Sequence, residues 1–271
     1  MPPVTYRQLL ENGWSRHAIL TALSRGSLRR LTRGWYEFGA SSSDELVAVQ
    51  KGVRLGCLTA LRGYGVWVPP TEHPHVIVPR WAAACGPGTH HPHPRDATWP
   101  RDVLTYGIED CLRQATRFHD VETALMVLES ACHLKLVPER VAREIIDECS
   151  PRHAKQLERF EPLSESGTET RVRLFLVRLG YDVTPQERLA EIGRVDLLVG
   201  KSLVIECDSH AHHTGEVAYQ RDRRRDLRAS ACGYRVIRLT WEQVFLDWEN
   251  TKALLREVLW TRGYRQPPLT A

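Results

Sequence analysis

Apolar and polar positions in the first 40 residues follow a helical spacing and then an alternating one. Thr5 and Ser15 have the side chains typical of helix N-caps, and Asn12 and Gly26 are expected to end two short helices. Residues 28–38 then alternate around a glycine turn and are rich in strand-forming side chains. The pattern predicts a helix-turn-helix followed by a β-hairpin wing.

Less regular patterns follow over residues 41–160, where we predict a mixed α/β connecting domain. The predicted elements are a helix from Ser41 to about Leu55, strands at 66–68 and 75–78, a loop rich in Pro, Gly and His at 82–100, and helices over 108–149. Two apolar helical stripes are expected to be core and not a binding surface. They consist of Ala124, Leu125, Leu128 and Cys132, and of Val141, Ile145 and Ile146.

The clearest periodicity begins after residue 160. Glu169 lies in the first turn of a strongly periodic helix, and two β-rich runs after it are joined by a glycine turn. These elements predict an αβ domain over residues 161–262, followed by a tail at 263–271. In order, they are a helix that ends at Gly180, strands at 193–199 and 202–208, a helix at 216–232, a strand at 235–239 and a helix after Thr240.

Length and composition set the fold class. With 271 residues, of which 42% are hydrophobic, the chain can bury a core and has room for two or three domains. We therefore predict a mixed α/β multidomain protein, with a winged helix-turn-helix at 1–40, the connecting domain, and the C-terminal αβ domain. The sequence has no run of about 18 apolar residues and no apolar leader, so we expect a cytoplasmic protein without a membrane partner.

The formal net charge of +4 is concentrated near the N-terminus, where residues 1–40 hold six arginines against two glutamates. A basic patch is expected of a surface that contacts phosphates, although arginines on a solvated face give the same pattern. The residues expected to contact DNA are Arg16 and His17 at the start of the second helix, and Arg29, Arg30 and Arg33 of the hairpin.

The seven cysteines are scattered singly along the chain, so we expect reduced and mostly buried thiols. Their spacing does not support a structural zinc site. His90, His91 and His93 lie close together in the predicted loop and could bind a metal adventitiously. We expect that loop to be exposed and mobile.

Acidic residues interrupt the two apolar β-runs of the C-terminal domain. Glu206 and Asp208 are two positions apart, so on a strand they share a face, and Asp196 can approach them from the neighbouring strand. A buried acid is costly unless its charge is compensated, and three converging carboxylates suit Mg²⁺ or Mn²⁺. Alternatively, Asp208 caps a turn and Asp196 pairs with Arg194 or with an arginine of the next helix.

These acids resemble the PD-(D/E)XK nuclease motif. Asp196 stands ten residues before Glu206, and Glu169 lies on the preceding helix, but Asp208 occupies the position where the motif usually has lysine. Within that superfamily, residues 164–248 are similar to the very-short-patch-repair (Vsr) endonuclease branch, with an acid in the first strand, a polar residue ending the second, a histidine cluster and an arginine-rich helix. The resemblance implies a restriction-endonuclease-like fold and metal-dependent cleavage.

Position by position, the resemblance assigns the metal ligands. It implies that Asp196 is the principal ligand and that Cys207, through its backbone carbonyl, supplies further oxygen together with Asp208. Glu206 could serve instead of Asp208. Glu169 is implied as a further catalytic residue of the preceding helix.

Water activation and phosphate contacts involve other residues. Because the usual lysine is absent, water activation falls to the metal or to a histidine, of which His213 is the first choice and His210 the second. A surface histidine cluster can also be incidental. Arg225 could steady the developing charge of a phosphate, or form an ion pair with Asp222. Other arginines of this helix would grip the DNA backbone, foremost Arg221 and Arg224.

The N-terminal region also carries a resemblance. Gly13-Trp14-Ser15 and Arg33-Gly34-Trp35-Tyr36 resemble matching places in the winged-helix domain of AbiEi-type antitoxins. We therefore expect a metal-dependent DNA endonuclease, without a small-molecule cofactor, that a winged helix places on DNA. The alternative is a non-catalytic DNA-binding regulator or antitoxin-like protein with a degenerate nuclease domain. RNA as substrate, a homodimer, and a role in repair or defence stay open.

Overall fold

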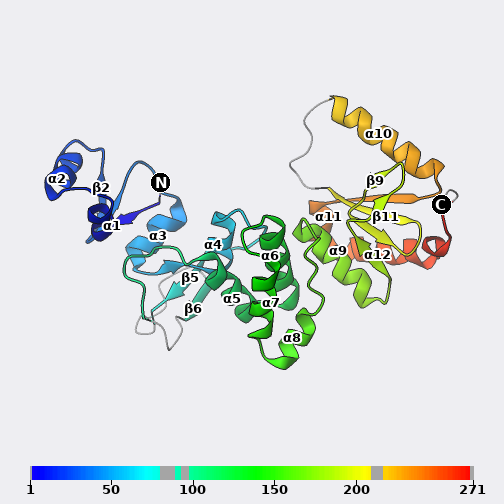
Figure 1. Ribbon diagram of the computed structural model, residues 1–271, viewed down its shortest axis with the longest axis horizontal. Helices are drawn as coiled ribbons and strands as arrows, with labels where there is room; N and C mark the ends of the chain where they lie inside the picture. Colours follow the sequence, from blue (N-terminus) through cyan, green and yellow to red (C-terminus); the bar gives the residue numbers. More distant parts are fainter. Residues whose placement is uncertain (1, 80–88, 93–97, 209–215, 269–271) are drawn as a thin grey trace. The chain divides into compact units, whose positions relative to one another are not determined.

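The computed structural model describes residues 2–79, 89–92, 98–208 and 216–268. The chain divides into two compact units, residues 1–66 with 71–119, and residues 67–70 with 120–271 (Figure 1). The units separate near residue 119, inside the predicted connecting domain. The predicted domain limits at residues 40 and 160 therefore stay predictions.

The first unit begins with two short helices and a three-stranded antiparallel sheet. Thr5 and Gln8 cap α1 reciprocally, and the Ser15 hydroxyl accepts the Ala18 backbone N–H to cap α2. The strands pair in the order β1-β3-β2, so the predicted helices and hairpin are confirmed. The bounds are β1 (Val4–Thr5), α1 (Tyr6–Glu11), α2 (Arg16–Ser24), β2 (Arg29–Thr32) and β3 (Trp35–Glu37).

A small apolar core holds these elements together, and one strand residue connects them to the next helix. Leu9, Ile19 and Leu28 are almost fully buried in this core. Trp35 packs instead in the next cluster, which includes Val49. Because Trp35 belongs to the core of the rest of the unit, the first 40 residues cannot be removed without exposing apolar surface.

The chain between residues 41 and 100 differs from the prediction at three places, of which residues 67–68 belong to the second unit. The helix expected to reach Leu55 ends at Lys51, because Gly52 adopts a left-handed conformation (φ 65°) that closes it. The described residues 66–68 form no strand, and the Trp67 backbone N–H donates instead to the Ser130 hydroxyl at 2.8 Å. Finally, part of the expected loop at 82–100 is a strand.

That strand, β6, pairs in parallel with β5, and β4 pairs with β5 on the other side. The segment Thr-His-His-Pro has few strand-forming residues, so its pairing comes from tertiary contacts and not from propensity. The bounds in this region are α3 (Ser43–Lys51), β4 (Arg54–Leu55), α4 (Cys57–Gly63), β5 (His75–Val78), β6 (Thr89–Pro92) and α5 (Ile108–Phe118).

The second unit opens with the predicted helices, which include both apolar stripes. Their aliphatic members are buried, as expected of core. A buried ion pair joins α6 to α9, because Arg173 donates to Glu129 at 2.6 Å, and Thr170 donates to the same carboxylate. The bounds are α6 (Val121–His133), α7 (Glu139–Asp147), α8 (Pro151–Leu157) and α9 (Gly167–Arg178).

A four-stranded sheet in the order β12-β11-β10-β7 forms the centre of the C-terminal part. Strands β7, β10 and β11 form an antiparallel meander, and β12 pairs in parallel with β11, which agrees with the predicted hairpin and final strand. The bounds are β7 (Val183–Pro185), β8 (Arg188–Leu189), β9 (Gly193–Arg194), β10 (Leu197–Val199), β11 (Leu203–Asp208), α10 (Glu216–Ala231), β12 (Arg235–Thr240), α11 (Trp241–Phe245), α12 (Trp248–Trp260) and η1 (Gly263–Arg265).

Helices cover both faces of this sheet. Alternate residues of β11 point to opposite faces: Ile205 packs in the cluster that contains α9 and α12, and Val204 packs with Ala229 of α10 (Figure 1). The fold is thus a mixed α/β layer structure. Within the described part of the chain, no helix combines the length and the apolar character that a membrane span requires.

The buried pair between Glu129 and Arg173 gives a stability prediction. Arg173→Met leaves the Glu129 carboxylate buried without its cation, which should lower the free energy of unfolding by about 3–5 kcal/mol. Arg140→Met breaks an exposed pair with Glu144 and should cost at most about 1 kcal/mol. Urea unfolding measures both changes, and equal losses would show that the buried pair has no special role.

Candidate active site

Three carboxylates gather at one end of the sheet of the second unit. Leu197 of β10 pairs with Ile205 of β11, which places Asp196 and Glu206 next to each other at the end of the pair. Glu169 comes from the first turn of α9, one layer away from the strands. The site is therefore built by a hairpin register and a helix start. The sequence predicted Glu169 on a helix and Asp196 and Glu206 on neighbouring strands, but with Asp208 as the third converging carboxylate.

Hydrogen bonds link the carboxylates in a row. The Cys207 backbone N–H donates to Asp196 Oδ2 at 2.8 Å, and the Asp196 backbone N–H lies 3.4 Å from Glu206 Oε2. Gln186 Nε2 donates to Glu169 Oε2 at 2.7 Å, and the Gln186 backbone N–H donates to the Asp196 carbonyl at 2.8 Å. Gln186 thus links the helix carboxylate to the strand residue Asp196.

Local backbone structure holds Glu169 in place. Ser166 is the N-cap of α9: its hydroxyl accepts the Glu169 backbone N–H at 3.2 Å and donates to Glu169 Oε1 at 2.9 Å. The Glu165 backbone N–H donates to the other carboxylate oxygen. A side chain that is only 4% exposed is therefore fixed by three donors of its own chain.

Burial changes the acidity of all three groups. Burial, together with the nearby charge of Asp196, raises the pKa of Glu169 to about 7 and that of Glu206 to about 7. Burial also raises the pKa of Asp196. Among the described residues, no arginine, lysine or histidine pairs with Glu169 or Asp196. The site therefore concentrates more negative charge than its own cations offset.

One arginine of α10 reaches the site. Arg225 Nη2 lies 2.9 Å from Glu206 Oε1, Nε donates to the Ile192 carbonyl at 3.1 Å, and Nη2 also bonds to the Arg194 carbonyl. Ala229, one turn further along the helix, is buried against the sheet. The predicted orientation of this helix face toward the acids is confirmed for Arg225.

Asp208 lies apart from this row. Its carboxylate is 3.5 Å from Arg238 Nη1, and Arg238 also contacts Asp226 at 2.7 Å. Among the described residues, no three of the carboxylates of Glu169, Asp196, Glu206 and Asp208 have donor atoms that all lie within 4.8 Å of one another. Glu206 and Asp208 each contact an arginine, Arg225 at 2.9 Å and Arg238 at 3.5 Å, so the predicted convergence of Asp196, Glu206 and Asp208 is not seen as one compact group.

The other predicted site residues have different positions. His210 and His213 lie outside the described residues, and the side chain of Arg221 is not described, whereas Arg224 is exposed. At the N-terminal end, Arg29 forms an ion pair with buried Glu37. The remaining DNA-contact candidates, which are Arg16, His17, Arg30 and Arg33, are exposed.

Sequence reasoning missed Gln186. Its backbone has a positive φ of 53°, which is uncommon for a residue with a side chain, and its side chain is placed between two acids. Gln186 Oε1 is buried and has no hydrogen-bond partner among the described residues. The signal in the sequence was a polar residue directly after β7, between the elements that carry Glu169 and Asp196.

These residues fit a divalent cation. Mg²⁺ is usually held by one or two carboxylates and retains several waters. The Asp196–Glu206 pair supplies two carboxylates, and the unpartnered Gln186 Oε1 is a further oxygen that a cation or its water could satisfy. Excess negative charge in a buried site is the condition that such an ion relieves.

Comparison with known families agrees with the fold. A model of the family described as REase_MTES_1575 matches residues 169–259. The match indicates a restriction-endonuclease-like domain. It begins at Glu169 and includes Asp196, Glu206 and Arg225, and a domain of this kind points to a nuclease. A search of curated proteins gave no match.

The raised pKa of Glu169 predicts a pH-dependent stability. The pKa is about 7 in the folded protein against an ordinary 4.5, so the folded protein binds this proton more tightly than the unfolded chain does. The stability that this proton gives is fully present below pH 4.5 and is lost as pH rises through 7. Glu169→Gln should therefore gain up to about 3 kcal/mol over the wild type at pH 8, and nothing at pH 4.

Thermal unfolding without added Mg²⁺ or Mn²⁺ measures this difference. Glu257→Gln, an exposed change on α12, is the matched control and should behave as the wild type at both pH values. The variant should gain stability over the wild type at pH 8 and not at pH 4. A gain that is smaller at pH 8 than at pH 4 would contradict the raised pKa of Glu169.

Proposed function

We propose that the C-terminal domain is a divalent-metal-dependent DNA endonuclease of the Vsr-like type, and that the N-terminal region is a winged helix that places it on DNA. The observation that carries the proposal is the pair formed by half-buried Asp196 and buried Glu206, at the strand ends of a domain with a restriction-endonuclease-like match. The product of the reaction would be a nicked or cleaved phosphodiester backbone.

Asp196 and Glu206 would hold Mg²⁺ or Mn²⁺, with the Cys207 carbonyl as a further oxygen. The Asp196 carboxylate is fixed by the Cys207 backbone N–H, which orients it before any ion binds. When bound, the cation supplies Lewis-acid polarisation of the scissile phosphate and makes water more acidic. Asp208, whose side chain is more exposed than that of Glu206, takes the outer position in this proposal.

The remaining residues would orient groups and hold protons. With a pKa of about 7, Glu169 can hold or release a proton near neutral pH, and Gln186 connects it to Asp196. His213, or failing that His210, stays the proposed residue for water activation. Within the described part of the chain, Arg225 contacts the protein through Nε and Nη2, which leaves Nη1 for a phosphate oxygen.

For the first unit, we propose that α2 and the β2–β3 hairpin contact DNA. The exposed side chains of Arg16 and His17 stand at the start of α2, where a winged helix approaches the groove, and Arg30 and Arg33 project from the hairpin. Arg29 is less suited, because it is already paired with Glu37. The hairpin arginines would bind phosphates without depending on the DNA sequence, and the start of α2 would face the groove.

One observation favours a second candidate, a DNA-binding regulator or antitoxin-like protein without catalysis. Asp208 stands where the motif usually has lysine, and its carboxylate pairs with Arg238. A domain that lost its lysine and kept its fold could bind nucleic acid without cutting it. Activity measurements separate the two candidates.

Plasmid nicking tests the nuclease. Supercoiled DNA incubated with the protein and Mg²⁺ or Mn²⁺ should be nicked, and Asp196→Asn should lower the rate by about a hundredfold or more, because it removes a charged ligand of the cation. Asp182→Asn, an exposed change in the same domain, should cut as the wild type does. Equal rates for Asp196→Asn and the wild type would reject the nuclease and leave the DNA-binding candidate.

Salt-dependent binding tests the N-terminal surface. Arg30→Gln combined with Arg33→Gln should weaken duplex DNA binding and reduce the slope of log affinity against log salt by about one to two, because each arginine that neutralises a phosphate releases counterions. Arg140→Gln combined with Arg152→Gln changes two exposed arginines of the second unit and should leave the slope unchanged. Identical slopes for both double variants would remove the assignment. Single-stranded RNA and DNA of the same length serve as competitors.

A further inference from the structure

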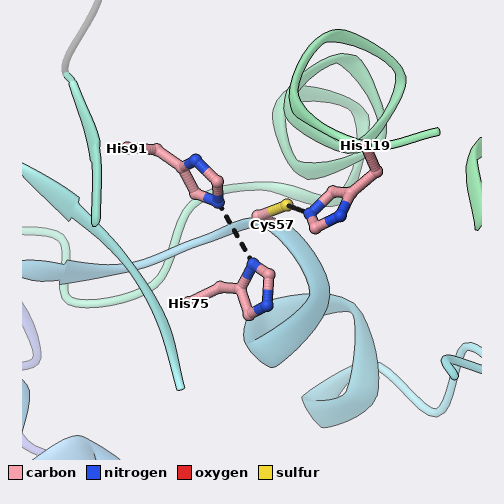
Figure 2. A group of neighbouring side chains, drawn as sticks. All are labelled: Cys57, His75, His91 and His119. Carbon is pink, nitrogen blue, oxygen red and sulfur yellow. Dashed lines mark hydrogen bonds between the residues drawn. The ribbon is translucent and has the colours of Figure 1, made fainter. Parts of the chain in front are cut away.

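Four metal-ligating side chains of the first unit converge on one point. Cys57 begins α4, His75 begins β5, His91 lies in β6, and His119 is the C-cap of α5. Their donor atoms all lie within 4.8 Å of one another, and Figure 2 shows the four side chains turned toward a common centre. We propose that these residues form a closed, structural Zn²⁺ site.

The backbone explains how residues far apart in the sequence meet. Strands β5 and β6 are parallel, and His91 stands opposite Ile77, two residues after His75, so the two histidines share a face of the sheet. His119 follows the last residue of α5, at the end of the helix where the backbone dipole favours a positive charge.

Cys57 is held in an unusual conformation. Its φ of 47° lies in the left-handed region, which is strained for a residue with a side chain and persists only where the surroundings enforce it. The Gln114 side-chain carbonyl accepts the Cys57 backbone N–H at 2.8 Å, and Thr59 likewise accepts the His75 backbone N–H at 2.6 Å. These contacts fix two of the four ligands from outside the cluster.

The distances suit a small tetrahedral ion. His75 Nδ1 and His91 Nε2 are 3.1 Å apart, as are Cys57 Sγ and His119 Nε2 (Figure 2). Zinc bonds of about 2.0–2.1 Å to nitrogen and 2.3 Å to sulfur place tetrahedral ligands about 3.3–3.7 Å from one another. These ideal separations are longer than the two 3.1 Å distances and shorter than the 4.8 Å within which all four donor atoms lie. Four protein ligands complete a tetrahedron, which is typical of a structural site.

Burial and donor type agree with zinc. Cys57 is 0% exposed, and His75 and His91 are 4% and 6% exposed. Nitrogen and sulfur donors select zinc over Mg²⁺, which the carboxylates of the second unit would bind.

A competing interpretation is a nucleophilic Cys57–His119 pair. A reactive cysteine needs access to substrate and a lowered pKa. Cys57 is fully buried, so a substrate has no access to its thiol. The geometry therefore favours a metal ligand, whose proton is displaced when a cation binds.

Metal analysis of the purified full-length chain, with any affinity tag removed, tests the site. The wild type should contain about one zinc ion per chain, and Cys57→Ser and His91→Ala should each lose most of it. Cys132→Ser changes a thiol of the second unit and should keep the zinc. Asp196→Asn should keep it as well, which separates this site from the proposed nuclease site.

Cobalt substitution gives a second readout that needs only the folded wild type. The Co²⁺ protein should show the strong visible absorption of tetrahedral coordination and a near-ultraviolet band from thiolate to cobalt. The His91→Ala variant should lose the tetrahedral pattern if it folds. If the ligand variants do not fold, competition between the wild type and a chromophoric chelator still measures zinc affinity.

Two results would overturn the site. The first is a folded wild type that takes up no zinc and gives no tetrahedral cobalt spectrum. The second is a Cys57→Ser variant that binds zinc as the wild type does. A wild type that contains zinc but does not nick plasmid DNA would instead count against the proposed nuclease and not against the zinc site.

Discussion

Burial of negative charge is the constraint on which the C-terminal domain depends. Glu169, Asp196 and Glu206 are held at the end of a sheet that helices cover on both faces, and Arg225 reaches only one of them. A pKa of about 7 for Glu169 corresponds to about 3 kcal/mol by which the folded protein disfavours the charged form. A bound ligand of positive charge would offset the cost of this buried negative charge. A divalent cation is the ligand that carboxylate oxygens suit.

The same arrangement explains why each supporting residue is where it is. The hairpin register of β10 and β11 sets Asp196 beside Glu206, the N-cap at Ser166 aims Glu169 from α9, and Gln186 connects the two layers. The parallel pairing of β12 with β11 returns the chain after α10, whose buried face directs Arg225 toward Glu206. Changes in these supporting contacts should therefore alter the site without removing a ligand.

The sequence predicted most of the elements that build the site and less of its exact composition. Two β-rich runs that carry acids identified β10, β11 and their acidic residues, cap residues identified the starts of α1 and α2, and helical periodicity identified α9, because these signals are local. The pairing of Asp208 with Arg238 depends on tertiary register, and Gln186 has no motif, so neither could be read locally. The Cys57 cluster was missed for the same reason: its four residues come from separate elements and become neighbours through β5–β6 pairing and the packing of α4 against α5.

The central claim is that Asp196 and Glu206 together hold a divalent cation. Titration of the zinc-loaded full-length protein with Mn²⁺, followed by electron paramagnetic resonance of the free ion, measures this binding without DNA. The wild type should bind Mn²⁺ at a site that Asp196→Asn and Glu206→Gln each weaken by about tenfold or more, because each removes one charged ligand. Unchanged Mn²⁺ binding in both variants would contradict the account.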